Sequence, residues 1–539
     1  MGISEDLDRE YLDFAGHLAA FEALLASPRS AKAAAQLVER IFAAPEAALQ
    51  ALEKLIGSAP GESQDAHGFS YHNLSQPVPP FMFARPERVA DLEELVRDAV
   101  AAGRRVKALG DGWGFSNAAS TDGYMIDLRG LNKVLPIDQT VTDIDTEPLL
   151  QFEAGATIDM LNAAIPDNLA LVNQPGFEEL TFLGTSAVGG HGSGLRFPAL
   201  SDSIRSLRLL RVSAEGALVW TQVEPSRGIT RADAFKSKYP EIELIQDDRV
   251  FAASIVAMGS LGIVYSLTIA LRPARNLRET RVLADWNEVR ELLPSLVQDT
   301  KFHSVAIWVN PYPIDRRQTC VIGKYEETDE ERKGQRPPAM TDVGGSLVLE
   351  RIVVWLLNNV QGSAPAVIDA ALRATLDSDV IMSPPLALNF GAPNRLRVKA
   401  SAVGVPLAAT PAVVERLTGE LSARADAGHW LGSALGLRFV PSARGLLAPQ
   451  SGRDTCMIEV PCLAGIRRSV DTILACHRLM VDEFAGRPHW GQLNPLSKAQ
   501  VRLAYGDNFR NFKRHFEALN PHRTFDNALT DQLGLRDLD

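Results

Sequence analysis

The sequence predicts an α+β protein built from two domains, with a helical extension at its start. Its 539 residues are more than one hydrophobic core usually organises, which favours two domains. From about residue 80 to 275, β-rich runs such as RRVKAL and LGIVYSLTIAL alternate with helical stretches, among them Arg88 to Ala101. Residues 1–75 differ, because Ala- and Leu-rich runs such as PEAALQALEKLIG have the spacing of amphipathic helices.

The second half of the chain predicts the other domain. Residues 276–490 mix helices, such as Val289 to Val297, with apolar strands and the proline-rich turns NPYPID and MSPP. A last segment, 491–539, holds a further helix and then ALNPHRTFDNAL. We therefore divide the chain into an extension at 1–75, a first domain at 76–275, a second domain at 276–490 and this C-terminal segment.

Composition and charge argue against several classes of partner. A net charge of −11, with no basic run interleaved with aromatic residues, argues against nucleic-acid binding. The most apolar run, IVVWLL at 352–357, is far shorter than the roughly 20 residues of a membrane span and suits a buried helix or strand. The start, MGISEDLDRE, has no signal-peptide pattern. Four scattered cysteines without a CxxC pair predict reduced, buried thiols in a cytoplasmic protein and no metal site: Cys320, Cys456, Cys462 and Cys476.

Three glycine-rich segments each stand beside a β-rich run. They are 110-GDGWGFS-116, 184-GTSAVGGHGSG-194 and 258-MGSLG-262. Successive backbone N–H groups in such turns form a concave site for an anion, whose approach a Cβ atom would block. None of the three matches the dinucleotide pattern G-x-G-x-x-G opening a helix or the loop G-x-x-x-x-G-K-[ST]. The segments predict a large phosphate-bearing cofactor. The alternative is that the glycines only form turns and bind nothing.

These segments belong to a longer series of motifs. In order they are GDGWGFSN, IDLRGLNKVL, FEAGATIDMLN, GGHGSG and MGSLGIV, and the tail carries HWGQLNPLS and ALNPHRTFDNAL. The series resembles the FAD-binding (PCMH-type) domain of the vanillyl-alcohol oxidase superfamily, nearest to type II cholesterol oxidases and sugar-lactone/alditol oxidases. The resemblance implies an FAD domain at 76–275, a cap-like substrate domain at 276–490 and a tail at 491–539 that returns to the FAD domain. The helical extension has no counterpart in it.

The resemblance also assigns residues to the cofactor. It matches the first loop to a pyrophosphate-binding segment, the second to a segment beside the flavin, and the third to a segment near the adenine. For Gly259 and Gly262 tight strand packing is the alternative, and for His191 a structural hydrogen bond. The implied cofactor contacts are Gly110, Asp111, Gly112, Trp113, Gly114, Phe115, Ser116, Pro175, Gly184, Gly189, Gly190, His191, Gly192, Ser193, Gly259, Gly262, Ile263, Gln492 and Asn527.

Position 113 decides how the cofactor is expected to be held. In many members of the family this loop carries a histidine that is bonded covalently to the flavin. Trp113 stands there in this chain, and an indole has no nucleophilic nitrogen comparable with that of imidazole. The resemblance therefore implies FAD bound without a covalent bond, with aromatic bulk beside its ring.

Flavin-dependent alcohol oxidation needs a base for the hydroxyl proton and a cation near the reduced flavin. In the relatives a Glu-x-Arg pair on a central strand supplies both. The matching stretch ALGLRFVP keeps Arg438 but has Gly436 in place of the glutamate, and Gln492 replaces a lysine of the relatives. The loss of two charged groups favours a less polar substrate than a sugar.

Several side chains are candidates for the base. His489 is the most natural one, because imidazole titrates near neutral pH. Glu459 is a candidate replacement carboxylate, as are Asp315 and the pair Glu178–Glu179. With Arg438 as the cation, our catalytic candidates are Arg438, His489 and Glu459.

These features predict an FAD-dependent oxidase that removes a hydride from a CH–OH (or CH–NH) group of a fairly apolar small molecule. Pro175 favours O₂ as the acceptor and H₂O₂ as the product, because small or ring residues at this position accompany oxygen reactivity in the family. One alternative is a dehydrogenase with another electron acceptor. Another is a flavoprotein with a non-redox or binding-only role. The sequence leaves oligomer formation open.

Overall fold

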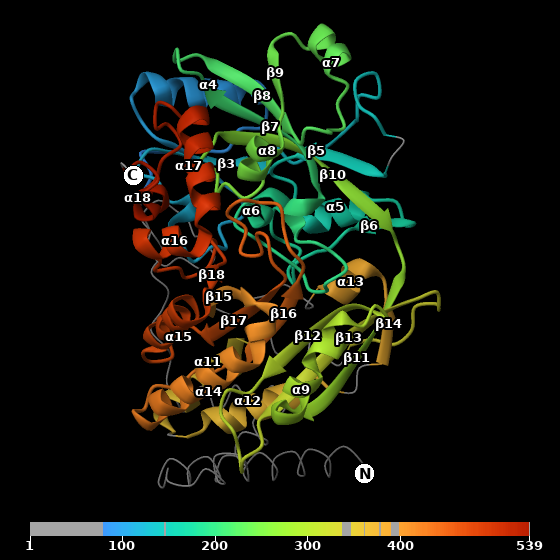
Figure 1. The fold of residues 1–539 in the computed structure, drawn as a ribbon, viewed down its shortest axis with the longest axis vertical. Coiled ribbons are helices and arrows are strands. Elements are labelled where there is room, and N and C mark those ends of the chain that lie inside the picture. The colour runs from blue at the N-terminus through green and yellow to red at the C-terminus, as the bar shows by residue number, and fades with distance from the viewer. Residues whose placement is uncertain are drawn as a thin grey trace, which may run out of the picture.

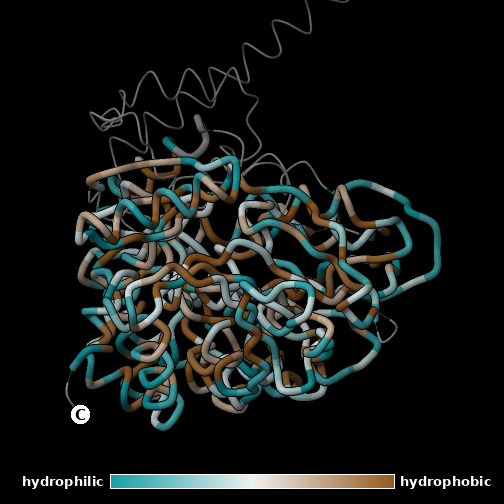
Figure 2. The backbone as a smooth tube through the Cα atoms, turned by 90° about the horizontal axis from the view of Figure 1, so that it is seen from above, coloured by the Kyte–Doolittle hydropathy of each residue, from teal (hydrophilic) through white to brown (hydrophobic). Residues whose placement is uncertain are grey.

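A computed structural model describes residues 79–144, 147–336, 347–360, 362–376, 379–389 and 398–537. The predicted helical extension at 1–75 lies outside these residues. Within them, the strands form three sheets. The first and second sheets lie in one half of the molecule and the third sheet lies in the other half along the long axis, with helices on the outside (Figure 1). Hydrophobic segments run through the interior and hydrophilic loops lie at the rim (Figure 2). The predicted α+β fold is confirmed.

The first sheet is small and parallel, with its strands in the order β1 (Met82–Ala84), β3 (Tyr124–Asp127) and β2 (Val106–Leu109). Helix α4 (Val89–Ala101) begins one residue after the predicted start at Arg88 and buries Leu92, Val96 and Ala99 on one face. Strand β2 ends where the first glycine-rich loop begins, so this sheet fixes the position of that loop.

The second sheet surrounds a long central strand, β10. This strand pairs antiparallel with three neighbours. The sheet consists of β4 (Val134–Leu135), β5 (Leu149–Glu153), β6 (Leu169–Leu171), β7 (Ile204–Val212), β8 (Leu218–Glu224), β9 (Ile242–Gln246) and β10 (Ile263–Pro273). Its helices are α5 (Ile158–Ala164), α6 (Phe182–Ser186), α7 (Ala232–Lys238) and α8 (Asp248–Ser254). The second glycine-rich segment begins inside α6 and continues beyond its end, and the third leads into β10.

The third sheet has eight strands, all of whose pairings are antiparallel. In sheet order they are β14 (Asp379–Met382), β11 (Asn276–Asp285), β13 (Thr319–Thr328), β12 (Phe302–Val309), β16 (Leu435–Val440), β17 (Thr455–Leu463), β15 (Val398–Pro406) and β18 (Arg487–Pro488). Helices α9 (Trp286–Gln298), α11 (Leu347–Asn359), α12 (Ala364–Arg373), α14 (Thr410–Asp426) and α15 (Ser469–Phe484) cover its outer face, and α13 (Pro384–Leu388) lies near β14 (Figure 1).

Successive side chains of β16 and β17 point alternately into the hydrophobic core and toward the opposite face of the sheet. On β16, Leu435, Leu437 and Phe439 belong to the hydrophobic core, whereas Arg438 faces the other way. On β17, Cys456, Ile458 and Val460 are core residues, and Met457, Glu459 and Pro461 face the same side as Arg438. The same period of two therefore builds the core on one face and a polar site on the other.

The apolar run at 352–357 lies in α11, where Ile352 and Leu356 are buried, so the predicted buried element is a helix. The four cysteines are free and buried, as predicted. Among the described residues, every helix is too short or too polar to cross a bilayer.

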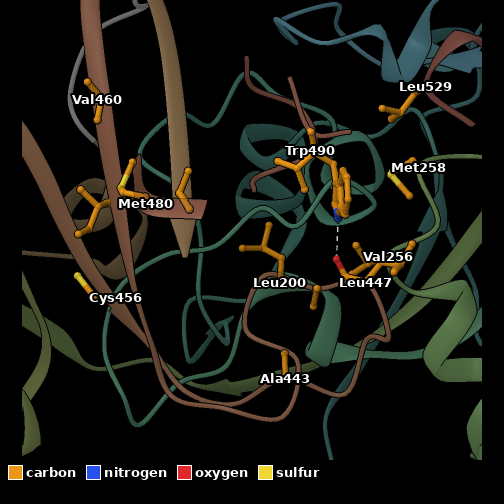
Figure 3. Packing of buried hydrophobic residues seen from close by; sticks show 14 of the residues in the cluster. Leu200, Val256, Met258, Ala443, Leu447, Cys456, Val460, Met480, Trp490 and Leu529 are labelled. Carbon is orange, nitrogen blue, oxygen red and sulfur yellow. Dashed lines mark hydrogen bonds between the residues drawn. The ribbon is translucent and has the colours of Figure 1, made fainter. Parts of the chain in front are cut away.

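The C-terminal segment packs beside the first sheet through α16 (Lys498–Tyr505), α17 (Asp507–Leu519) and α18 (Ala528–Leu533) (Figure 1). The segment that precedes it is anchored by Trp490, which is fully buried near Val256, Met258 and Leu447 (Figure 3). The indole Nε1 donates to the carbonyl of Leu447 at 2.6 Å. Because His489 and Gln492 flank this anchor, the core fixes the backbone from which both side chains extend.

Candidate active site

A cavity of about 550 Å³ lies where the three glycine-rich loops face the third sheet. Its volume is within the roughly 300–1,000 Å³ of ligand sites in proteins. Residues from distant parts of the chain share its wall. Those predicted from the sequence are Gly110, Asp111, Gly112, Trp113, Gly114, Phe115, Ser116, Pro175, Gly184, Gly190, His191, Gly259, Arg438, Glu459, His489 and Gln492. The predicted cofactor residues and the predicted catalytic residues thus meet around one cavity.

The first loop is packed so closely against Thr181 that Gly110 has no room for a side chain, and Gly184 of the second glycine-rich segment is packed against the same residue. A Cβ atom added at Gly110 would collide with Oγ1 of Thr181, and one added at Gly184 would lie 2.5 Å from the same oxygen. The loop is also tied to the segment after Trp490, because the Phe115 N–H donates to the carbonyl of Gly491 at 2.8 Å. Its glycines therefore bring backbone, and not side chains, to the cavity.

The second loop contributes Gly190 and His191 to the cavity, whereas Gly189, Gly192 and Ser193 lie outside its wall. Gly192 has no room for a Cβ, which would collide with the side chain of Asn173. Ser193 Oγ donates to the carbonyl of Val305 at 2.5 Å and accepts from the N–H of Phe439 at 3.2 Å. Ser193 thus ties the second loop to the third sheet.

In the third loop, Met258 and Gly259 line the cavity and both have positive φ, at 52° and 63°. Gly262 and Ile263 lie outside the wall. A Cβ at Gly262 would lie 2.7 Å from Leu209 Cδ1, so this glycine permits strand packing, which is the alternative given above. Lys107, a buried side chain that sequence reasoning missed, donates to the Gly259 carbonyl at 3.1 Å from behind the loop.

Asn527 also lies outside the cavity wall. Its side-chain amide donates to the carbonyls of Asn117, Ala118 and Ser120 at 2.9–3.1 Å, and its Oδ1 accepts from the N–H of Thr530. The residue caps α18 and holds the turn that follows the first glycine loop. Its contacts in the structure are with this turn, and the predicted cofactor contact remains a prediction.

Two aromatic residues form an apolar part of the wall. The rings of Trp113 and Phe177 lie 5.8 Å apart between centroids, inclined at 41°. Pro175, which is buried, stands beside them in the wall. Phe177 was missed by sequence reasoning, since nothing in FEEL distinguishes its phenylalanine from a core residue.

Opposite the loops, β16 and β17 carry the charged part of the site. Their pairing places Gly436 directly across from Glu459, and a Cβ added at Gly436 would lie 3.8 Å from Glu459 Oε2. Gln492 donates from Nε2 to Glu459 Oε1 at 2.8 Å. Arg438 is half-buried; desolvation lowers its pKa, and the negative charge of Glu459 opposes that shift. The missing side chain at 436 therefore leaves space beside a carboxylate of the neighbouring strand.

The other candidate carboxylates lie outside the wall. Asp315 is an exposed turn residue with φ of 49°. Glu178 is half-buried and accepts from Asn162 at 3.5 Å, and burial raises its pKa; neither Glu178 nor Glu179 lines the cavity. Among the described wall residues, the carboxylates are Asp111 and Glu459. Asp111 is paired with Arg129 at 2.9 Å, which leaves Glu459 as the carboxylate of the charged part.

Two imidazoles complete this part of the site. The rings of His191 and His489 meet edge to face, with centroids 6.1 Å apart. Burial, helped by the charge of Arg438, lowers the pKa of His489 to about 4 and that of His191 to about 3. Both rings are therefore neutral at physiological pH.

Comparison with known proteins agrees with this geometry. Residues 80–222 match the family model of an FAD-binding domain, and residues 267–533 match the model described as D-arabinono-1,4-lactone oxidase. The chain belongs to the PCMH-type FAD-binding superfamily. It is an FAD-dependent oxidoreductase.

Members of this superfamily resemble the chain over most of its length. L-Gulono-1,4-lactone dehydrogenase of Mycobacterium tuberculosis is 26% identical, over 84% of this chain and 95% of its own. L-Gulonolactone oxidase of Bos taurus is 22% identical over the same shares. Among solved structures, cholesterol oxidase from B. sterolicum has a TM-score of 0.64 at 13% identity, covering 84% of this chain and 93% of its own. The structural likeness shows the fold.

The wall residues fit FAD. Gly110 and Gly184 let two backbone segments pack closely on Thr181 and line one cavity, where backbone N–H groups suit a pyrophosphate. Arg129 neutralises the one carboxylate of the first loop, Asp111. Trp113 and Phe177 offer an aromatic surface against which a ring can pack. Gln492 Oε1 is a buried acceptor without a hydrogen-bond partner in the described part of the chain, which a ligand N–H or O–H would satisfy.

Proposed function

We propose that this protein is an oxidase that uses FAD to remove a hydride from the CH–OH (or CH–NH) group of a small molecule with an apolar body. One observation carries the proposal. Arg438 and Glu459 stand on paired strands in the same cavity wall, opposite loops that fit FAD. Bound FAD would supply the two-electron acceptor for the carbon that is oxidised.

In this proposal Glu459 accepts the hydroxyl proton. Its Oε1 is held by Gln492, while Oε2 lies beside the space left by Gly436. Arg438 supplies a positive charge that stabilises the negative charge developing during oxidation. The hydroxyl proton moves to Glu459, the hydrogen leaves the carbon with two electrons, and the alcohol becomes a carbonyl compound.

The apolar body of the substrate is supported by the remaining wall. Val398, Ala400 and Ala402 of β15 and Met457 and Pro461 of β17 present apolar side chains around the charged groups. Such a surface suits carbon rings, because each buried apolar group gains free energy on leaving water.

Oxidation of a sugar lactone is the second candidate. It is supported by the match of residues 267–533 to a lactone-oxidase model and by relatives named for gulonolactone. The unpaired acceptor Gln492 Oε1 also suits a ligand with an additional hydroxyl donor. On this reading the apolar wall would contact one face of the lactone ring.

A substrate panel separates these candidates. The FAD-loaded enzyme is mixed anaerobically with cyclic secondary alcohols, sterols, secondary amines, L-gulono-1,4-lactone and D-arabinono-1,4-lactone, and loss of the yellow flavin absorbance is followed. Bleaching by the apolar alcohols supports the first candidate, and bleaching by the lactones alone supports the second. If no compound bleaches the flavin, the redox proposal fails in favour of a non-redox or binding role.

We propose O₂ as the electron acceptor, with Pro175 in the cavity wall as the support from this chain. The relatives do not decide the point, since one is named a dehydrogenase and another an oxidase. The reduced enzyme is mixed with air-saturated buffer in a stopped-flow instrument. Rapid return of the yellow colour with release of H₂O₂ supports an oxidase, and slow return favours a dehydrogenase.

Non-covalent attachment of FAD and a cytoplasmic location complete the proposal. Trp113 stands in the loop that would carry a covalent histidine, and the described wall contains neither cysteine nor tyrosine. Acid precipitation should therefore release yellow flavin into the supernatant. Colour that stays in the pellet would contradict the proposal and point to His191 or His489 as the attached side chain. The buried free thiols support the cytoplasmic location.

A further inference from the structure

The two imidazoles of the cavity carry their protons on opposite nitrogens. Nδ1 of His489 accepts a hydrogen bond from the backbone N–H of Gly491 at 3.2 Å. A backbone N–H can only donate, so Nδ1 bears the lone pair and the ring proton is on Nε2. Nδ1 of His191 lies 2.9 Å from the carbonyl of Gly192, which can only accept. His191 therefore has its proton on Nδ1 and its lone pair on Nε2.

The backbone around His489 holds this arrangement in place. The His489 N–H donates to the carbonyl of Ala402 at 2.9 Å, and the Trp490 N–H donates to that of Val188 at 3.0 Å. A Cβ at Gly491 would lie 3.2 Å from His489 Cε1 and 2.9 Å from Val188 Cγ2. The glycine thus allows its own N–H to reach the ring, and the imidazole is fixed in one tautomer with Nε2–H as its remaining polar group.

That Nε2–H is available to a ligand. His489 lines the cavity, and no other described residue forms a hydrogen bond with Nε2 of either ring. The charge of Arg438 from β16 acts on both rings. The other charged residues of the described wall are Glu459 from β17 and Asp111 of the first loop. Protonation of His489 would place a second positive charge beside Arg438, which is unfavourable. His489 therefore stays neutral and can donate a hydrogen bond from Nε2.

We propose that His489 is a catalytic hydrogen-bond donor to the oxygen that is oxidised, and not the base. This inference rests on the proposed function and assigns the roles within it. The hydroxyl proton would pass to Glu459 as the O–H bond breaks, bound FAD would supply the acceptor for the hydrogen that leaves carbon with two electrons, and Nε2–H of His489 would stay intact while it stabilises the developing negative oxygen. A neutral imidazole can serve in this way as an electrophile.

The tautomer can be read without any substrate. The FAD-loaded enzyme is labelled with ¹⁵N-histidine, and proton–nitrogen correlation spectra near neutral pH identify the protonated nitrogen of each ring, with His489→Gln and His191→Gln used for assignment. We expect Nε2–H for His489 and Nδ1–H for His191. A lone pair on Nε2 of His489 would overturn the proposal. This result is independent of whether the substrate panel succeeds.

Kinetics then tests the role. The amide of His489→Gln can place an N–H near the position of Nε2, whereas His489→Ala cannot. With the substrate found in the panel, we expect His489→Ala to slow flavin reduction by about 10²–10³-fold. His489→Gln should recover much of this loss and keep the wild-type pH profile.

A base would give a different pattern, in which the glutamine and alanine variants lose the rate equally. That outcome would overturn the proposal. His477→Gln is the matched control. His477 is another buried imidazole of lowered pKa, but it bonds to Ser401 and lies outside the cavity wall, so its variant should reduce flavin at the wild-type rate.

Discussion

The two walls of the cavity differ in which groups they present: one presents backbone and the other presents charged and polar side chains. The glycine wall depends on side chains that are absent from its glycines; it is formed by residues 110–116, 184, 185, 187, 188, 190, 191, 258 and 259. The sheet wall, formed by β15, β16, β17 and residues 489–492, depends on side chains that are present: Arg438, Glu459, His489 and Gln492. One wall binds through backbone groups and the other reacts through charged and polar groups. Mutations should therefore separate cofactor binding from chemistry.

The largest effect is expected in the glycine wall, from Gly110→Ala. The added methyl group would collide with Oγ1 of Thr181 but would lie 3.5 Å from its Cβ, an ordinary contact. We expect Gly110→Ala to abolish FAD binding and give a colourless protein. Removing the obstructing oxygen in Gly110→Ala/Thr181→Ala should restore the yellow colour, as measured by flavin titration.

Gly419→Ala is the control for this pair. Gly419 lies in helix α14, and a Cβ there meets nothing within 4 Å. Its variant should bind FAD normally and gain up to about 1 kcal/mol of stability from the higher helix propensity of alanine. If Gly110→Ala binds FAD as tightly as Gly419→Ala does, the glycine wall does not act by close backbone approach.

The next largest effect belongs to the sheet wall. Glu459→Gln keeps a carbonyl oxygen for the bond from Gln492 but removes the proton acceptor. We expect the protein to remain yellow while flavin reduction slows by about 10²–10⁴-fold, the usual contribution of a general base. Unchanged reduction rates would remove Glu459 from the chemistry.

The pairing of the two strands sharpens this test. Because Gly436 lies directly opposite Glu459, the double variant Gly436→Glu/Glu459→Ala moves the carboxylate across one strand while leaving the wall otherwise intact. We expect it to reduce flavin faster than Glu459→Ala, measured anaerobically with the same substrate. Equal rates in the two variants would show that the carboxylate cannot act from position 436.

The glycine wall could be predicted from the sequence more fully than the sheet wall, and the reason is physical. A backbone site needs glycine at particular positions, and glycine is visible in the sequence, so Gly110 and Gly190 could be placed. The partner that makes Gly110 necessary, Thr181, is 71 positions away and has no local signature. Likewise Glu459 could be listed only as one of several acids, until the register of β16 and β17 set it beside Gly436.

The tautomers of the imidazoles were beyond sequence reasoning for a similar reason. His489 is a natural base by its ordinary pKa, and the sequence alone favours that role. Its proton position depends on one backbone N–H, that of Gly491, and its lowered pKa depends on burial near Arg438. The proton position and the pKa of His489 both depend on tertiary contacts, which a local sequence pattern does not specify. The helix α4, in contrast, follows from local periodicity and was predicted to within one residue.

The smallest expected effect is on the pH dependence of stability, and it comes from Lys107, whose buried amine donates a hydrogen bond to Gly259 in the glycine wall. Burial lowers the pKa of Lys107 from its ordinary 10.5 to about 7, and the charge of Asp526 opposes the shift. Between pH 7 and 10 the unfolded chain binds a proton at this position that the folded chain does not. Raising the pH through this window therefore stabilises the folded state, by up to about 1.4 kcal/mol per pH unit.

Lys107→Met, which keeps the volume and removes the titration, should lack this dependence. We expect the free energy of unfolding in urea to rise more steeply with pH in the wild type than in this variant, from pH 7 to 9, with the difference disappearing below pH 7. Lys236→Met removes an exposed amine and is the control, expected to run parallel to the wild type. Parallel curves for Lys107→Met would instead mean that the amine stays charged in the folded state. The glycine wall would then rest on a paired cation and not on a neutral hydrogen-bond donor to Gly259.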